Sequence, residues 1–158
     1  MKRLLWIVLC AVAFAAGPVV AQQTPSDTNM QILRDKIKAD KKLLVAANMQ
    51  LTDAEAKRFW PVYDAYQIDL QAINERLAKA ILVYADGYKK NTLTDEQAKK
   101  LIADALAIEG SEVKLRQRYA GKLEKVLPGK KVARYLQIES KIRAAVRYEL
   151  AAGIPLVE

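Results

Sequence analysis

Between residues 53 and 89, apolar side chains recur at alternating steps of three and four, and this pattern constrains the fold more than any other feature of the sequence. The recurring residues are Phe59, Tyr63, Tyr66, Leu70, Ile73, Leu77, Ile81, Tyr84 and Tyr88. This spacing places side chains on one face of an α-helix, so the pattern predicts a helix that packs against other helices along one seam. At 1.5 Å per residue the helix would be about 55 Å long. Pro61 lies within it and predicts a kink near Lys57.

The rest of the chain also favours helices over strands. Segments rich in Ala, Leu, Lys, Glu and Gln, which are strong helix formers, lie between a few short turn signals, and no stretch alternates with the period of two that is typical of a strand. We therefore predict an all-α fold, an elongated helical hairpin or bundle with one long kinked helix. The four expected helices cover residues 28–48, 53–89, 95–126 and 129–151.

Some large apolar side chains of the long helix lie off its main seam. They are Trp60, Val62, Leu82 and Val83. They can form a second contact within one chain, a dimer seam, or an exposed patch for a partner. Because a helix of this length is too long for a four-helix monomer to cover, we favour a homodimer.

The first 21 residues have the pattern of a secretory signal peptide. Lys2 and Arg3 precede an apolar stretch, and Ala21 provides the small residue needed at a cleavage point. The apolar stretch is shorter than the roughly 20 residues that span a bilayer, which argues against the alternative of a membrane anchor. We expect residues 1–21 to be removed, residues 22–29 to be a flexible leader, and residues 30–158 to form a single helical domain.

The composition argues against catalysis and against transition-metal binding. The chain has no histidine, and its single cysteine, Cys10, lies in the expected signal peptide. Disulfides, Cys–His and Ser–His–Asp arrangements, and zinc or copper sites built on imidazole or thiolate are thereby excluded from the expected mature chain. No Gly-rich phosphate loop and no EF-hand-like spacing of carboxylates occurs. We expect no enzyme activity, no cofactor and no metal site.

A short phrase occurs twice, as LTDAEAKRF at residues 51–59 and as LTDEQAKKL at residues 93–101. In each copy a threonine precedes an expected helix, and a Glu or Gln follows it three residues later. This spacing is that of a capping box, in which the two residues satisfy each other's free backbone N–H groups. The predicted capping residues are Thr52, Glu55, Thr94 and Gln97.

Positive charge is concentrated in the last third of the chain. Residues 22–111 contain 13 basic and 13 acidic side chains, whereas residues 112–150 contain 11 basic and 4 acidic ones, an excess of +7. Such an excess is either a solvated face or a surface that attracts acidic polypeptides or anionic lipids. Nucleic acid is not an expected partner of an exported protein. The candidate contact residues are Arg116, Arg118, Lys122, Lys125 and Arg134.

The export signal, the four helices and the two phrases resemble the Spy/CpxP family of periplasmic proteins. Leu93, Thr94 and Gln97 match that family's LTxxQ motif in full, while the first copy has Glu55 where the motif has glutamine. The resemblance implies a thin, curved helical dimer in the periplasm, with secretion from the cell as the alternative location. Members of the family bind unfolded proteins without ATP, dampen an envelope-stress sensor, or bind metals.

Three functions remain open on this sequence. An ATP-independent chaperone-like protein would bind unfolded or partly folded polypeptides through a basic and apolar surface, for which the candidates are Trp60, Leu82, Val83 and the basic residues named above. A regulatory protein would bind one membrane sensor domain. A structural envelope protein would have no client. We favour the chaperone-like function.

Overall fold

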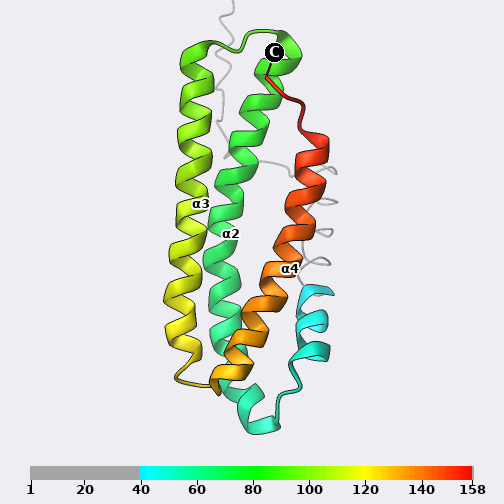
Figure 1. Cartoon of the computed structure of the whole chain (residues 1–158), viewed down its shortest axis with the longest axis vertical. Coiled ribbons are helices and arrows are strands. Elements are labelled where there is room, and N and C mark those ends of the chain that lie inside the picture. Colours follow the sequence, from blue (N-terminus) through cyan, green and yellow to red (C-terminus); the bar gives the residue numbers. More distant parts are fainter. Residues whose placement is uncertain (1–39, 158) are drawn as a thin grey trace, which may run out of the picture. The chain divides into compact units, whose positions relative to one another are not determined.

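A computed structural model of the chain describes residues 40–157 (Figure 1). In this range the fold is all-α, with four helical segments and no strand, as the sequence predicts. The expected signal peptide, the expected leader and residues 28–39 of the first expected helix lie outside the described residues. None of the helices in the described range is long and apolar enough to cross a membrane.

The observed helices agree closely with the predicted ones. A helical segment at residues 40–49 is followed by α2 at Asp53–Lys90, α3 at Asp95–Leu123 and α4 at Gly129–Gly153. Helices α2 and α3 form an antiparallel hairpin, and α4 runs back alongside it (Figure 1). Helix α3 ends at Leu123 instead of residue 126, because the following residues form turns that bring Leu127 into the core.

The hydrophobic core occupies the half of α2 that lies nearer its N-terminus. The seam residues Phe59, Tyr63, Tyr66, Leu70 and Ile73 are buried, whereas those from Leu77 onward are only half-buried. Aromatic rings of three helices meet edge to face in this core. The ring centres of Tyr66 and Tyr119 are 5.3 Å apart, and those of Phe59 and Tyr135 are 5.2 Å apart.

Two buried glutamates join the helices through charged hydrogen bonds. Glu139 of α4 accepts hydrogen bonds from Lys41 at 2.8 Å and from Gln67 at 3.0 Å. Glu112 of α3 accepts hydrogen bonds from two arginines of α4, at 3.3 Å and 2.9 Å. A buried carboxylate is tolerated only with such partners, so these contacts fix which faces of the helices meet.

Pro61 lies inside α2, and the helix is continuous on both sides of it. The predicted kink at this point and the predicted curved dimer both stay predictions.

Candidate functional site

Both repeated phrases form capping boxes at the starts of helices. At α2, the backbone N–H of Thr52 donates to Glu55 at 2.8 Å, and the N–H of Glu55 donates to the Thr52 hydroxyl at 3.3 Å. At α3, the equivalent distances between Thr94 and Gln97 are 2.9 Å and 3.3 Å. The four predicted capping residues therefore satisfy the backbone groups that each helix start leaves free.

The first capping box has an additional partner that the second lacks. Lys131, at the start of α4, forms an ion pair with Glu55 and also donates to the backbone carbonyl of Gln50 at 3.0 Å. The hydrogen bond from Lys131, followed by that from the Thr52 backbone, lowers the pKa of Glu55 to about 2. The capping phrase at residues 51–59 thus also joins the start of α2 to the start of α4.

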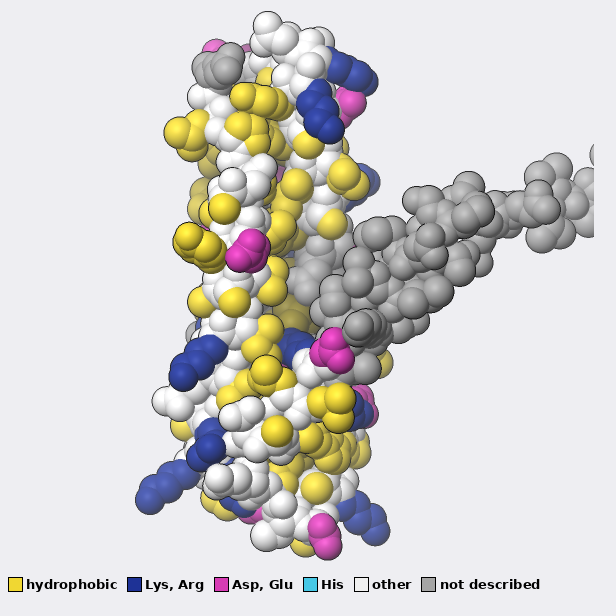
Figure 2. Space-filling view, turned by 90° about the vertical axis from the view of Figure 1, so that its right-hand side faces the viewer, with side chains coloured by type: hydrophobic (Ala, Val, Ile, Leu, Met, Phe, Trp, Pro, Cys, Tyr) yellow, Lys and Arg dark blue, Asp and Glu magenta, His cyan; other side chains and the backbone are white. Residues whose placement is uncertain are grey.

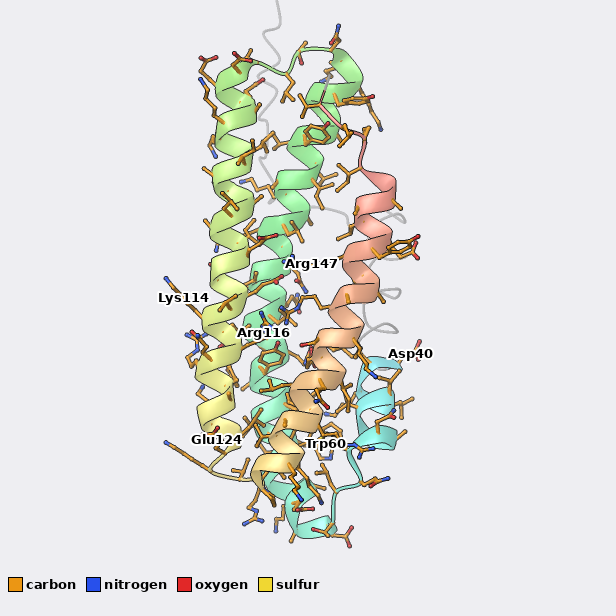
Figure 3. The ribbon with its side chains drawn as sticks, viewed as in Figure 1. Asp40, Trp60, Lys114, Arg116, Glu124 and Arg147 are labelled. Atoms are coloured by element: carbon orange, nitrogen blue, oxygen red, sulfur yellow. The ribbon has the colours of Figure 1, made fainter. Side chains whose placement is uncertain are left out.

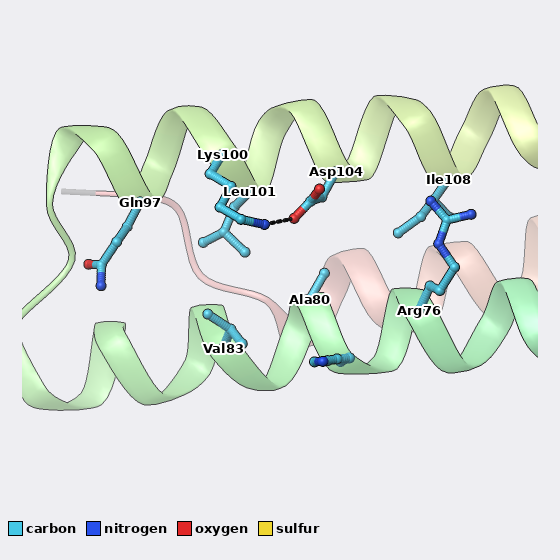
Figure 4. A pocket seen from close by; sticks show the side chains of 9 residues that line it. Arg76, Ala80, Val83, Gln97, Lys100, Leu101, Asp104 and Ile108 are labelled. Carbon is cyan, nitrogen blue, oxygen red and sulfur yellow. Dashed lines mark hydrogen bonds and ion pairs between the residues drawn. The ribbon is translucent and has the colours of Figure 1, made fainter.

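A hollow of about 370 Å³ lies between α2 and α3, near the end of the hairpin where the two helices are connected (Figure 4). Its apolar lining comes from Ala80 and Val83 of α2 and from Leu101 and Ile108 of α3. Charged side chains stand around it, and two of them, Lys100 and Asp104, pair with each other at 2.6 Å. The remaining lining residues are Arg76, Lys79 and Gln97.

A second hollow of about 330 Å³ continues the first one toward the α2–α3 connection. The two share Lys79, Val83 and Gln97, and the second adds Leu82 and Leu93 to the lining. The connection passes close to Gly87, where a Cβ would lie 3.3 Å from the Leu93 side chain. We refer to the two hollows together as the hairpin groove.

The hairpin groove brings part of the repeated motif together with two candidate contact residues. Leu93 and Gln97 belong to the LTDEQ phrase, and Leu82 and Val83 are two of the four large apolar residues that lie off the seam of α2. Leu82 and Val83 are 70% and 50% exposed. The sequence identified these residues separately but could not show that they line one surface.

Trp60 lies away from this groove. It is half-buried beside Phe59 and Tyr63, and the Lys42 ammonium lies 5.1 Å from the centre of its ring. Figure 3 shows it at the opposite end of α2 from the hairpin connection. At 1.5 Å per residue, Trp60 and Leu82 are about 33 Å apart along the helix. The length of the helix therefore separates Trp60 from Leu82 and Val83, so the three do not form one compact patch, and their role as client contacts stays a prediction.

The basic candidates do not form one patch either. Arg118 pairs with Asp69 of α2 at 3.3 Å, and the Lys122 ammonium lies 4.1 Å from the centre of the Tyr119 ring. Arg134 donates to the backbone carbonyl of Asn48 at 2.6 Å, at the C-terminal end of the segment 40–49, where a cation is favourable. Arg134 and Lys125 form no ion pair or ring contact with a described residue, and Lys125, which is exposed, also makes no side-chain hydrogen bond to one.

Arg116 differs from the other basic candidates. It lies in a cleft between α3 and α4, and its Nε is buried without a hydrogen-bond partner. Much of the charge excess in the last third of the chain is thus used within the molecule, since Lys131, Arg143 and Arg147 also form ion pairs.

The sequence analysis missed one exposed apolar row. Ile102, Leu106 and Val113 of α3 are 62%, 63% and 43% exposed and follow helical spacing. Glu109, which pairs with Arg147 of α4, lies in the same row, so the row is on the side of α3 that faces α4. The spacing of Ile102, Leu106 and Val113 in the sequence was the signal that could have revealed this row. Figure 2 shows the side of the molecule on which α4 lies, where hydrophobic side chains are visible along much of the length and several Lys and Arg side chains stand at the edges.

No group of three or more potential metal-ligating side chains occurs among residues 40–157. No family model, curated protein or solved structure matches the chain.

Proposed function

We propose that the protein is a non-catalytic, chaperone-like protein that binds unfolded or partly folded polypeptides. The hairpin groove carries this proposal. It combines an apolar lining from two helices with a charged rim, and its lining includes Leu82, a large apolar side chain that is 70% exposed.

A groove of this kind suits clients of varied sequence. Apolar contacts are not directional, so many apolar side chains can bind the same lining. The basic side chains at the rim accelerate the approach of acidic segments without requiring a defined geometry. The proposal also includes export to the periplasm and a homodimer, which rest on the sequence of residues 1–21 and on the length of α2.

The groove can be tested with two substitutions on the same helix. Leu82→Ser removes an apolar side chain from the groove, and Ile68→Ser is the matched control, because Ile68 is also 70% exposed but lines neither hollow of the groove. Both should change the free energy of unfolding by no more than about 0.5 kcal/mol. We expect Leu82→Ser alone to weaken the suppression of aggregation of two chemically different denatured clients.

Two results would contradict this function. If the wild-type protein suppresses aggregation of neither client, the chaperone-like proposal is wrong. If it suppresses aggregation but the two variants are equally active, the groove is not the binding surface. Tight binding to one membrane sensor domain, without protection of either client, would instead favour the regulatory function.

A further inference from the structure

We propose that the cleft between α3 and α4 at Arg116 is a binding site for a phosphate group. The cleft has a volume of about 290 Å³ and lies apart from the hairpin groove. Three arginines line it, Arg116 from α3 and Arg143 and Arg147 from α4. This site is independent of the proposed chaperone-like function.

The ion pairs in the cleft leave one arginine without a partner. Glu112 accepts hydrogen bonds from Arg143 at 3.3 Å and from Arg147 at 2.9 Å, and Arg147 also pairs with Glu109 at 3.1 Å. Arg116 makes no hydrogen bond or ion pair with any residue that the structure describes. The cleft therefore has three positive and two negative charges, and the unbalanced charge is that of Arg116.

Arg116 is also incompletely hydrogen-bonded. Its Nε is buried from solvent and has no acceptor, although a guanidinium stays charged at every relevant pH. Buried donors are almost always paired, so an unpaired one in a cleft indicates a missing partner. In Figure 3, Arg116 and Arg147 lie between the helices, whereas Lys114 points away from them.

The neighbouring groups favour a tetrahedral oxyanion. Ser140 of α4 lines the cleft opposite Arg116, and its hydroxyl makes no hydrogen bond to a described residue. The oxygens of a phosphate point in four directions and can accept at once from donors on both helices, including a guanidinium fork and a hydroxyl.

The charge of a phosphate also suits the cleft. Phosphate is a mono- or dianion near neutral pH, and it would compensate the charge of Arg116 and accept its unpaired N–H. The same chemistry is offered by inorganic phosphate and by the headgroup of an anionic lipid. Both sources therefore have to be tested.

Calorimetric titration of the purified protein with inorganic phosphate tests the site. We expect saturable binding to the wild-type protein and to the control variant Lys114→Gln, because Lys114 is on the same helix but does not line the cleft. Arg116→Gln should weaken binding about ten- to a hundredfold, as expected for the loss of a charged hydrogen bond. Arg116→Lys should weaken it less, since the charge is kept and only the fork is lost. Circular dichroism of each variant verifies that it is folded.

Flotation with vesicles of phosphatidylglycerol or phosphatidylcholine separates the two sources. Binding to phosphatidylglycerol alone, kept in Lys114→Gln and lost in Arg116→Gln, would identify a lipid headgroup as the ligand. Binding of inorganic phosphate without binding of vesicles would identify the free ion. The proposal is overturned if neither binds, if Arg116→Gln binds phosphate as the wild type does, or if acetate or chloride at matched ionic strength gives the same binding.

Discussion

Replacing the buried carboxylate of Glu139 by Glu139→Ala should destabilise the bundle strongly. Glu139 is 2% exposed, and it holds donors from three helical segments. Lys41 donates at 2.8 Å, Gln67 at 3.0 Å, and the Tyr135 hydroxyl at 3.1 Å. The substitution removes the charged acceptor of all three groups, and Lys41 keeps only the neutral Gln67 Oε1 at 2.9 Å.

The size of the effect is determined mainly by Lys41. Its side chain is 16% exposed, so after Glu139→Ala a largely buried ammonium has no counter-charge. Removing one partner of a buried ion pair costs about 3–5 kcal/mol, and the partial exposure of Lys41 places the expected loss near the lower limit. This is a large fraction of the roughly 5–15 kcal/mol that holds a domain folded.

Urea unfolding followed by circular dichroism measures this loss. Glu149→Ala is the matched control, because Glu149 lies on the same helix but is exposed and forms no ion pair with a described residue. It should change the free energy of unfolding by at most about 0.5 kcal/mol. The double variant Lys41→Met with Glu139→Leu should recover most of the stability, because apolar residues can replace a buried ion pair. The reasoning is wrong if Glu139→Ala is as stable as the control. It is also wrong if the double variant loses as much free energy of unfolding as Lys41→Met and Glu139→Leu lose in sum when each is made alone.

Three further predictions concern pH, charge and assembly. Burial raises the pKa of four tyrosines, Tyr63, Tyr66, Tyr119 and Tyr135, so the unfolded chain loses these protons at lower pH than the folded one. The free energy of unfolding should therefore fall as pH rises above about 10. Tyrosinate absorbance should increase together with the loss of helix. Lys79→Glu, at the rim of the hairpin groove, should slow client capture at low salt and reduce its salt dependence, because the screening length falls from about 10 Å at 0.1 M to about 3 Å at 1 M. Lys122→Glu with Lys125→Glu, at the other end of α3, is the control, and equal capture by all three proteins would exclude steering by the rim. Sedimentation at tens of micromolar should show a dimer, and a monomer alone would contradict the homodimer.

The sequence predicted the helices and their capping residues because both depend on short spacings. Steps of three and four identify a helical face, and a threonine three residues before Glu or Gln identifies a capping box. The partners of the basic residues could not be predicted in this way. Lys41 lies 98 residues from Glu139, and Lys131 lies 76 residues from Glu55, so only the packing of the helices brings them together.

Helical spacing also does not show which apolar rows another helix covers. The seam of α2 and the row of Ile102, Leu106 and Val113 on α3 have similar spacing. The first is partly buried and the second is exposed. The difference depends on the path of α4, which contacts α3 over only part of its length. Ion pairs of Glu112 join α4 to α3 and the ion pair of Glu139 joins α4 to the segment 40–49, and the sequence does not reveal these partners.

The two capping phrases differ at their last capping residue, Glu55 against Gln97, and the contacts of these residues lead to a last prediction. A glutamine in place of Glu55 would still cap α2, because its side-chain oxygen can accept from Thr52. It would carry no charge for Lys131. Gln97 has no cation among its hydrogen-bond partners, so a carboxylate there would gain only a favourable position at the start of the helix.

The substitutions Glu55→Gln and Gln97→Glu exchange the two capping residues and should therefore have unequal effects. Gln97→Glu should change the free energy of unfolding by at most about 0.5 kcal/mol, whereas Glu55→Gln should lower the urea midpoint clearly. The pH dependence supplies a second readout. The pKa of Glu55 is lowered to about 2, mainly by Lys131, so its contribution is complete above its ordinary pKa of 4.5 and is lost as pH falls toward 2. The difference in midpoint between the wild type and Glu55→Gln should accordingly shrink over this range, because a protonated Glu55 no longer pairs with Lys131. A difference that stays constant from pH 6 to pH 2 would show that the charge of Glu55 does not hold α4 to the start of α2.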